Sequence, residues 1–261
     1  MRPRVTSRMT PRTTPVVKQT AAIGVVVPVH NEEELLGSAL AALNVAFAEV
    51  RHTGIQWGAA IVLDGCHDDS ASIARRWARS LAQLEGRHTT VVVRCRNIGV
   101  GGARRLGCGA LLRRWRTLDP DDIWLATTDA DSRVPPRWLA SQLAAHGAGV
   151  NVWTGRVSVE DWSPDDEGLA RRWNDAYEDE KAPIHGASLG FDARMYLEVG
   201  GFALVRTGED RALYEAIVDA GGLVHDDREL RVITSGRRQG RAPLGFAHAL
   251  DTFDERLRSS A

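Results

Sequence analysis

Two aspartates, Asp129 and Asp131, follow an apolar run at residues 123–128 that is typical of a buried strand. Carboxylates that leave a sheet at the carboxyl end of a strand lie where open α/β sheets bind their ligands. Mg²⁺ and Mn²⁺ need few carboxylates, because phosphate oxygens and water complete their coordination. The pair therefore predicts that one aspartate binds a divalent metal and the other a ribose hydroxyl or a metal-bound water. A bare Asp-x-Asp is also compatible with a helix or turn cap.

A second pair of carboxylates, Glu209 and Asp210, opens an amphipathic helix predicted over residues 210–220. The helix dipole keeps a carboxylate at this end ionised, which suits either a helix cap or a general base. Leu213 and Tyr214 follow Asp210 by three and four residues, so the spacing predicts that Asp210 shares their inward face. We therefore expect Asp210 to be the catalytic base, with Glu209 as the alternative.

Polar segments also follow the first two predicted strands. Residues 28–33, with the sequence PVHNEE, follow the strand at 23–28, and Asp64 follows the strand at 59–63. Both lie where a base or a ribose can dock, and the carboxylate of Asp64 can accept the imide N–H of a base. Asn31 is equally suited to be the N-cap of the following helix.

A glycine-rich segment at residues 99–107 resembles the dinucleotide-binding fingerprint but departs from it. The spacing of its glycines requires a third glycine where Arg104 stands. The segment therefore argues against an NAD site. It predicts instead a glycine-lined helix start, around Gly102, that brings Arg104 or Arg105 near a phosphate or a base.

A basic loop and several single residues complete the candidates. Arg237, Arg238 and Arg241 are close in sequence, which suits the clamping of a diphosphate but also a solvated loop. His225 is either a third metal ligand or a residue that only packs. The tryptophans that can stack on a sugar ring or belong to the core are Trp153, Trp162 and Trp173.

The elements that must position these residues alternate between strand and helix in the first half of the chain. Apolar runs at 23–28, 59–63, 89–93 and 123–128 are separated by segments of helical spacing. The pattern predicts an α/β fold with a single, Rossmann-like, mostly parallel sheet flanked by helices. Later segments read as a helix to 146, strands at 150–159 and 230–234, a short helical segment within 186–201 and a final helix at 244–257.

Composition limits the possible functions. The chain has 261 residues, is 43% hydrophobic and has a net charge of −1, which fits one large domain and gives no electrostatic case for nucleic-acid binding. Residues 1–20 are basic and read as a disordered arm, followed by a domain at 21–261. Three cysteines favour a reduced, cytoplasmic protein. No run of 18 apolar residues predicts a membrane span, which leaves at most peripheral contact at the inner face of the cell membrane.

The order of these motifs resembles that of the family 2 glycosyltransferases of the GT-A fold. The resemblance covers about residues 22–245 and rests on PVHNEE, LDGCHDDS, NIGVGGARRLG, TTDAD, VGGF and GED. The chain departs from the family pattern at Cys66, His67, Ser70 and Arg105, and none of these departures removes a carboxylate.

The resemblance implies a nucleoside-diphosphate sugar donor of the UDP or GDP type, a divalent metal (Mn²⁺ or Mg²⁺) and inversion at the anomeric carbon. Residues 21–132 then form the nucleotide-sugar half, and 133–261 form a smaller acceptor half lined by His185 and Gly186. Asp131 and Asp129 go to the metal, and Asp210 becomes the base. The nucleotide pocket comprises Pro28, His30, Asn31, Glu32, Asp64, Gly102, Arg104, Asp129 and Ala130.

The expected activity is transfer of one sugar to an acceptor hydroxyl, in cell-envelope, glycolipid or secondary-metabolite glycosylation. Two alternatives remain. A sugar nucleotidyltransferase would carry a glycine-rich, basic loop after the first strand, where PVHNEE stands instead. The other is a nucleotide-sugar-binding domain that has lost catalysis, against which all three acidic positions are present.

Overall fold

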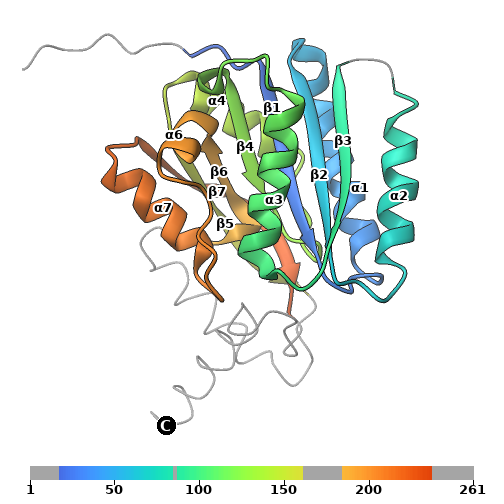
Figure 1. Cartoon of the computed structure of the whole chain (residues 1–261). Helices are drawn as coiled ribbons and strands as arrows, with labels where there is room; N and C mark the ends of the chain where they lie inside the picture. The colour runs from blue at the N-terminus through green and yellow to red at the C-terminus, as the bar shows by residue number, and fades with distance from the viewer. Residues whose placement is uncertain (1–17, 85–86, 161–183, 237–261) are drawn as a thin grey trace, which may run out of the picture.

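The computed structural model describes residues 18–84, 87–160 and 184–236. The first half alternates strands and helices, as the apolar runs predicted (Figure 1). Its elements are β1 (Ala22–Val29), α1 (Leu36–Val50), η1 (Arg51–Thr53), β2 (Gln56–Asp64), α2 (Ser70–Leu81), β3 (His88–Cys95), α3 (Gly99–Arg114), η2 (Pro120–Asp122) and β4 (Ile123–Thr127).

The second half adds three strands, of which the sequence predicted one, predicted another only in part and did not predict the third. Its elements are α4 (Trp138–Gly147), β5 (Val152–Glu160), η4 (Gly186–Ser188), β6 (Leu189–Asp192), α6 (Ala193–Glu198), α7 (Glu209–Asp219) and β7 (Val224–Ser235). The sequence predicted only a short helical segment where β6 and α6 lie, and only the last part of β7.

All seven strands form one sheet in the order β3-β2-β1-β4-β6-β5-β7. β6 is antiparallel to both of its neighbours, whereas the other strands run in one direction. The parallel strands therefore end at one edge of the sheet, which we call the carboxyl edge. This architecture confirms the predicted α/β class and the mostly parallel sheet.

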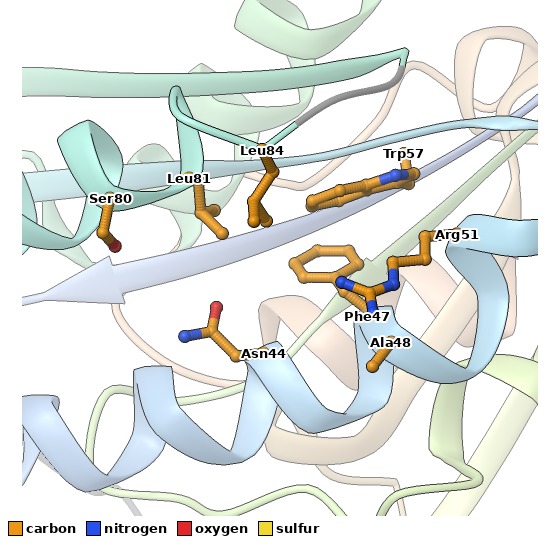
Figure 2. A pocket seen from close by; sticks show the side chains of 8 residues that line it. All are labelled: Asn44, Phe47, Ala48, Arg51, Trp57, Ser80, Leu81 and Leu84. Carbon is orange, nitrogen blue, oxygen red and sulfur yellow. The ribbon is translucent and has the colours of Figure 1, made fainter.

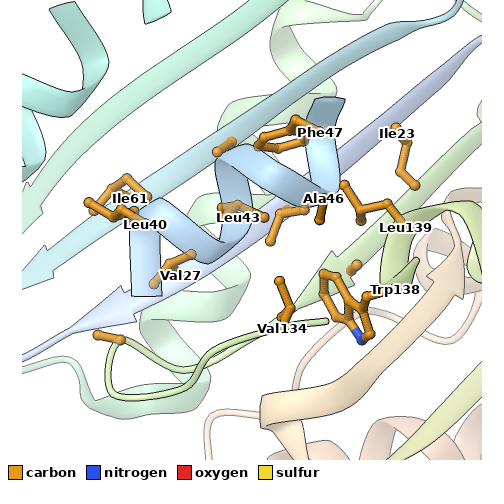
Figure 3. Packing of buried hydrophobic residues seen from close by; sticks show 14 of the residues in the cluster. Ile23, Val27, Leu40, Leu43, Ala46, Phe47, Ile61, Val134, Trp138 and Leu139 are labelled. Carbon is orange, nitrogen blue, oxygen red and sulfur yellow. The ribbon is translucent and has the colours of Figure 1, made fainter. Parts of the chain in front are cut away.

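Helices cover both faces of the sheet, because its central strands are apolar on both sides. On one face α1, α2 and α4 pack on the sheet, and Figure 3 shows Leu40 of α1 beside Ile61 and Val27 in this cluster. On the other face α3, α6 and α7 form a second cluster around Leu111, Phe191, Phe202 and Leu213.

A pocket of about 250 Å³ lies between α1 and α2, over the first residues of β2 (Figure 2). Its walls include the rings of Phe47 and Trp57, whose centroids are 4.7 Å apart. Trp57 is the second residue of β2 and Asp64 is its last, so this pocket lies away from the carboxyl edge. None of the predicted site residues lines it.

The start of the described chain is anchored to the opposite edge of the sheet. Lys18 donates its backbone N–H to the carbonyl oxygen of Gly147 at 3.2 Å, and its Nζ lies 2.5 Å from Oδ2 of Asp192. Thr20 Oγ1 lies 2.7 Å from Nδ1 of His146. The prediction of a disordered arm over residues 1–20 is therefore wrong for Lys18 to Thr20, while residues 1–17 lie outside the described residues.

Candidate active site

A buried arginine joins two of the predicted acidic positions at the carboxyl edge. Arg104 in α3 is only 3% exposed. Its Nη2 donates to Oδ1 of Asp129 at 2.6 Å, and its Nη1 donates to Oε1 of Glu209. Asp129 follows β4 and Glu209 begins α7, so α3 links the two halves of the site. The prediction that Arg104 approaches a phosphate or base is replaced by carboxylate pairing in this structure.

Electrostatics explain why this cation stays charged inside the protein. Burial alone would lower the pKa of Arg104, but Asp129 and Glu209 outweigh it and raise that pKa above its ordinary value. Burial also raises the pKa of Glu209, against the opposing effect of the Arg104 guanidinium. The cluster thus gathers its negative charge around one buried cation.

Small residues allow this close packing. A Cβ at Gly101 would lie 2.8 Å from the carbonyl oxygen of Ala203 and 3.0 Å from Cβ of Glu209, so α3 approaches the start of α7 closely. A Cβ at Gly186 would collide with the guanidinium of Arg104. The turn at Gly186 is held by Thr127, whose Oγ1 donates to the Gly186 carbonyl oxygen at 2.6 Å.

Asp210 has different surroundings from its neighbour. Its Oδ2 accepts the backbone N–H of Gly186 at 2.7 Å, and its Oδ1 accepts that of Arg211 at 2.8 Å. Asp210 is half-buried, whereas Glu209 is 3% exposed. The prediction that Asp210 occupies the inward face of α7 is therefore wrong, since Glu209 does. Asp210 is nevertheless the more accessible carboxylate, and its role as base stays a prediction.

His185 lies beside Asp210 on the predicted acceptor side. Burial lowers the pKa of His185 to about 4, the nearby Asp210 opposes this effect, and Arg156 and Arg211 add to it. At neutral pH the imidazole is therefore neutral. His185 therefore does not form an ion pair with Asp210 at this pH.

Two loops of the predicted nucleotide pocket are tied together by hydrogen bonds. Asn31 Oδ1 accepts the backbone N–H of His67 at 2.8 Å, and the N–H groups of Glu32 and Glu33 donate to Ser70 Oγ and Asp68 Oδ2. We call this set of bonds between residues 31–33 and 67–70 the loop clasp. Asn31 has φ 55°, and α1 begins only at Leu36, so Asn31 is not the N-cap that the sequence suggested.

Asp64 ends β2 and caps α3. Its two carboxylate oxygens accept the backbone N–H groups of Ile98 and Gly99 at 2.9 and 2.8 Å. His30, which is exposed, contacts the Asp64 carbonyl oxygen through Nδ1 at 2.5 Å. Base recognition by Asp64 stays a prediction, and the structure adds this capping role.

The other predicted pocket residues lie on the same edge. Pro28 is near the end of β1 and half-buried, Ala130 is buried after β4, and Gly102 is buried in the first turn of α3. A Cβ at Gly102 would lie 3.1 Å from Cβ of Ile98, so the glycine permits a tight helix start.

The two aspartates after β4 fit a cation that takes ligands from elsewhere. The side chain of Asp129 is 36% exposed, and Asp131 is half-buried. No group of three or more His, Cys, Asp or Glu side chains arranged to hold a metal occurs among the described residues. Such a sparse donor set suits Mg²⁺ or Mn²⁺ with phosphate oxygens and water, and suits a metal with four protein ligands poorly.

His225 is not part of this set. It is exposed at the beginning of β7 and is paired in register with Trp153, whereas Thr234 near the end of β7 contacts Ser132 at 2.9 Å. His225 therefore lies towards the opposite edge of the sheet from Asp131. The prediction of His225 as a third metal ligand is wrong for this geometric reason.

The remaining predictions divide into two groups. Trp153 is fully buried and packs edge-on against Trp138, so it belongs to the core and does not face a sugar. Arg237, Arg238, Arg241, Trp162 and Trp173 lie outside the described residues. Thr127 was missed by sequence reasoning, although a threonine at the end of a buried apolar strand was the available signal.

No helix in the described part of the chain is both long and apolar enough to cross a membrane.

The chain resembles several solved structures at low sequence identity. The mannosyltransferase PcManGT from Pyrobaculum calidifontis, in complex with GDP-Man and Mn²⁺, superposes with a TM-score of 0.60 at 19% identity. The match covers 93% of this chain and 63% of PcManGT, so this chain spans less than two thirds of that protein.

Two further structures support the same fold. S. aureus TarS 1–349 in complex with UDP has a TM-score of 0.57 at 14% identity, covering 91% of this chain and 72% of that chain. The Mycobacterium tuberculosis glucosyl-3-phosphoglycerate synthase with Mn²⁺, UDP and glucosyl-3-phosphoglycerate has a TM-score of 0.54 at 16% identity, covering 97% and 86%. Among curated proteins none matches the chain.

The sequence itself matches the family model of glycosyl transferase family 2 over residues 24–207. This range contains the two aspartates after β4, Arg104 and the loop clasp, and it ends just before Glu209. The match and the sheet architecture confirm the family and fold that the order of motifs predicted. The chain therefore belongs to glycosyl transferase family 2 and has the GT-A fold of the glycosyltransferases.

Proposed function

We propose that this protein transfers a sugar from a UDP- or GDP-linked donor to an acceptor hydroxyl, with inversion at the anomeric carbon. The observation that carries the proposal is the position of Asp210. It is a half-buried carboxylate held by the Gly186 N–H, next to the cluster of Arg104, Asp129 and Glu209. The similar structures hold UDP, or GDP-Man with Mn²⁺, which supports a nucleotide-sugar donor here.

Asp210 supplies the base in this proposal. The acceptor hydroxyl oxygen attacks the anomeric carbon while the bond from that carbon to the diphosphate breaks, and the hydroxyl proton goes to Asp210. The Gly186 and Arg211 N–H groups orient this carboxylate. The nucleoside diphosphate leaves on the opposite side of the sugar, which gives inversion.

Asp131, with Asp129, would hold a divalent metal, which when bound supplies positive charge against the leaving diphosphate. Asp64 and the loop clasp would receive the nucleoside. The loop clasp would fix this pocket before ligand arrives, because its bonds join the loops that follow β1 and β2. The predicted cytoplasmic location and peripheral membrane contact rest on the sequence alone and stay predictions.

Release of UDP or GDP from a panel of nucleotide sugars tests the proposal. We expect release with Mn²⁺ and an acceptor, and its loss with EDTA or in Asp131→Asn. Thermal shifts with each nucleotide and Mn²⁺ would report binding independently. Binding without release across an acceptor panel would favour a binding domain without catalysis. Release that is equal with Mn²⁺ and with EDTA would remove the metal from the proposal.

A further inference from the structure

Arg104 lies between a carboxylate on the proposed donor side of the site and one on the proposed acceptor side. It is buried in α3, its two Nη atoms point to different carboxylates, and those carboxylates belong to different parts of the chain. Asp129 follows β4 on the donor side, and Glu209 begins α7 on the acceptor side. The guanidinium therefore connects the two sides through charged hydrogen bonds.

Gly186 makes room for this connection. Any Cβ at this position would collide with Cζ and both Nη atoms of Arg104. The Gly186 carbonyl oxygen is held by Thr127, and its N–H donates to Oδ2 of Asp210 at 2.7 Å. The turn thus lies between the guanidinium and the predicted base, so a shift of Arg104 would be transmitted to Asp210.

We propose that Arg104 is a positioning residue that joins Asp129 to Glu209, and that Gly186 is the gap that admits its guanidinium. This inference rests on the proposed function. Arg104 holds one oxygen of Asp129 and leaves the other for the cation. It also holds Glu209, so that Asp210 is the carboxylate left for the acceptor hydroxyl.

Arginine is required at this position because of its shape. Its planar fork presents donors in two fixed directions, whereas the ammonium of lysine is a single point of charge on a flexible stem. A lysine at position 104 would keep the positive charge but would hold one carboxylate at a time. Arg104→Lys therefore separates charge from geometry.

The connection can be tested without any substrate. We expect the loss of melting temperature in the Asp129→Asn, Glu209→Gln double variant to exceed the sum of the single losses by about 2–6 °C. The reason is that each single variant leaves one carboxylate hydrogen-bonded to Arg104, whereas the double variant leaves this buried cation with neither. Additive losses would overturn the connection.

Its effect on the reaction is tested with variants that keep the carboxylates. Arg104→Lys and Gly186→Ala should each lower kcat for nucleoside-diphosphate release by about 10- to 100-fold, the cost of misplacing reacting groups by about 1 Å. The KM for the donor should change by less than about threefold, because the bound ground state is little affected. The kcat of the Arg104→Lys, Gly186→Ala double variant should be no lower than that of Arg104→Lys alone, because both changes break the same connection.

Matched controls lie on the same helix. Gly109→Ala introduces a Cβ with nothing within 4 Å, and Arg113→Lys changes an exposed arginine at the far end of α3. Both should keep wild-type turnover. The positioning role would be overturned by full turnover in Gly186→Ala. It would also be overturned if the losses of kcat multiplied in the Arg104→Lys, Gly186→Ala double variant. Thermal coupling in the Asp129 and Glu209 variants, together with a wild-type protein that releases no UDP or GDP from any donor, would instead overturn the proposed function.

Discussion

Asp210 and Glu209 are adjacent residues whose different environments suit them to different roles. Glu209 is buried and paired with Arg104, while Asp210 is half-buried and accepts two backbone N–H groups. A base must reach a hydroxyl on a bound acceptor, and a carboxylate already engaged by a guanidinium is poorly placed to do so. Asp210, the more accessible of the two carboxylates, is therefore the better base.

We expect Asp210→Asn to retain donor binding and to lose about 10²–10⁴ in transfer rate, the usual range for removal of a general base. Asparagine keeps the shape and can still accept a backbone N–H, so binding and folding should survive. Steady-state kinetics and calorimetric donor titration measure the two effects. Asp219→Asn, an exposed change at the other end of α7, is the control.

Glu209→Gln should cost less activity than Asp210→Asn. The assignment of the base would be reversed if Glu209→Gln abolished transfer while Asp210→Asn remained near wild type. If both variants stayed active, no carboxylate of this pair would be the base. Either result would be read from the same kinetic series.

His185 should make stability depend on pH. Burial lowers its pKa to about 4 from an ordinary value of 6.5, so the unfolded chain binds this proton more readily than the folded protein. Stability is then complete above pH 6.5 and declines as pH falls from 6.5 to 4, by up to about 3 kcal/mol.

Urea unfolding at pH 7, 5.5 and 4.5 measures this dependence. His185→Asn should flatten the profile in that window, whereas His52→Asn, an exposed change in η1, should leave it unchanged. An unaltered slope in His185→Asn would assign the pH dependence to other groups.

The two carboxylates of α7 also show where reasoning from spacing failed. The prediction gave Tyr214 the same weight as Leu213, but Leu213 is buried and Tyr214 is only half-buried. The buried stripe of α7 is Glu209, Leu213 and Ile217, in steps of four residues. The prediction placed the inward face wrongly because it counted apolar residues at the margin of the buried stripe. The local sequence gave no indication that Glu209 pairs with Arg104.

At the scale of elements, strands with continuous apolar runs were predicted and strands defined by their neighbours were not. β1, β2 and β4 are buried on both faces, and their composition shows it. β6 is a four-residue strand containing a glycine, and its conformation depends on antiparallel pairing with β4 and β5. The first half of β7 is polar and exposed, because β7 is an edge strand, so hydrophobic pattern could not mark it.

The junction between β2 and α3 shows an element and a site sharing one residue. Asp64 caps the start of α3 through Ile98 and Gly99, and it is also the predicted reader of the base. Asp64→Asn keeps one carbonyl oxygen for the cap but loses the charge. We expect nucleotide binding to weaken by about 1.5–3 kcal/mol, the range for hydrogen bonds to charged groups.

Calorimetric titration of UDP and GDP with Mn²⁺ measures this change. Asp219→Asn is again the control, because Asp219 is exposed at the far end of α7. An unchanged dissociation constant in Asp64→Asn, together with a lower melting temperature, would assign Asp64 to capping alone.

At the scale of the whole molecule, the candidate site and a buried group of charged residues lie at opposite edges of the sheet. The carboxyl edge gathers Asp64, Asp129, Asp131 and Asp210, while the opposite edge holds a buried group of charges around Asp192. Asp192 ends β6, the strand that runs against its neighbours, so its side chain lies with the beginnings of the parallel strands. There it meets Lys18, one of two lysines in the chain.

Lys18 should therefore be a determinant of stability even though it precedes the first strand. Asp192 is fully buried, and Lys18 is 20% exposed at its side chain. Burial acts to raise the pKa of Asp192, but hydrogen bonds from His146, Lys18 and the Met195 N–H outweigh it and hold that pKa below its ordinary value. The stabilisation is then present above about pH 4 and is lost as pH falls through the folded-state pKa.

Lys18→Met should lower the free energy of unfolding at pH 7 by about 1–4 kcal/mol, between the values for exposed and buried ion pairs. It should also shift acid unfolding to higher pH, because the pKa of Asp192 rises when the ammonium is removed. Lys18→Arg should restore most of the loss. Arg194→Met removes an exposed cation that pairs with Asp119 and Asp121, and it should leave the melting temperature nearly unchanged. Equal losses in Lys18→Met and Arg194→Met would mean that Lys18 acts as an ordinary surface charge, and that the buried Asp192 is stabilised by His146 and the Met195 N–H alone.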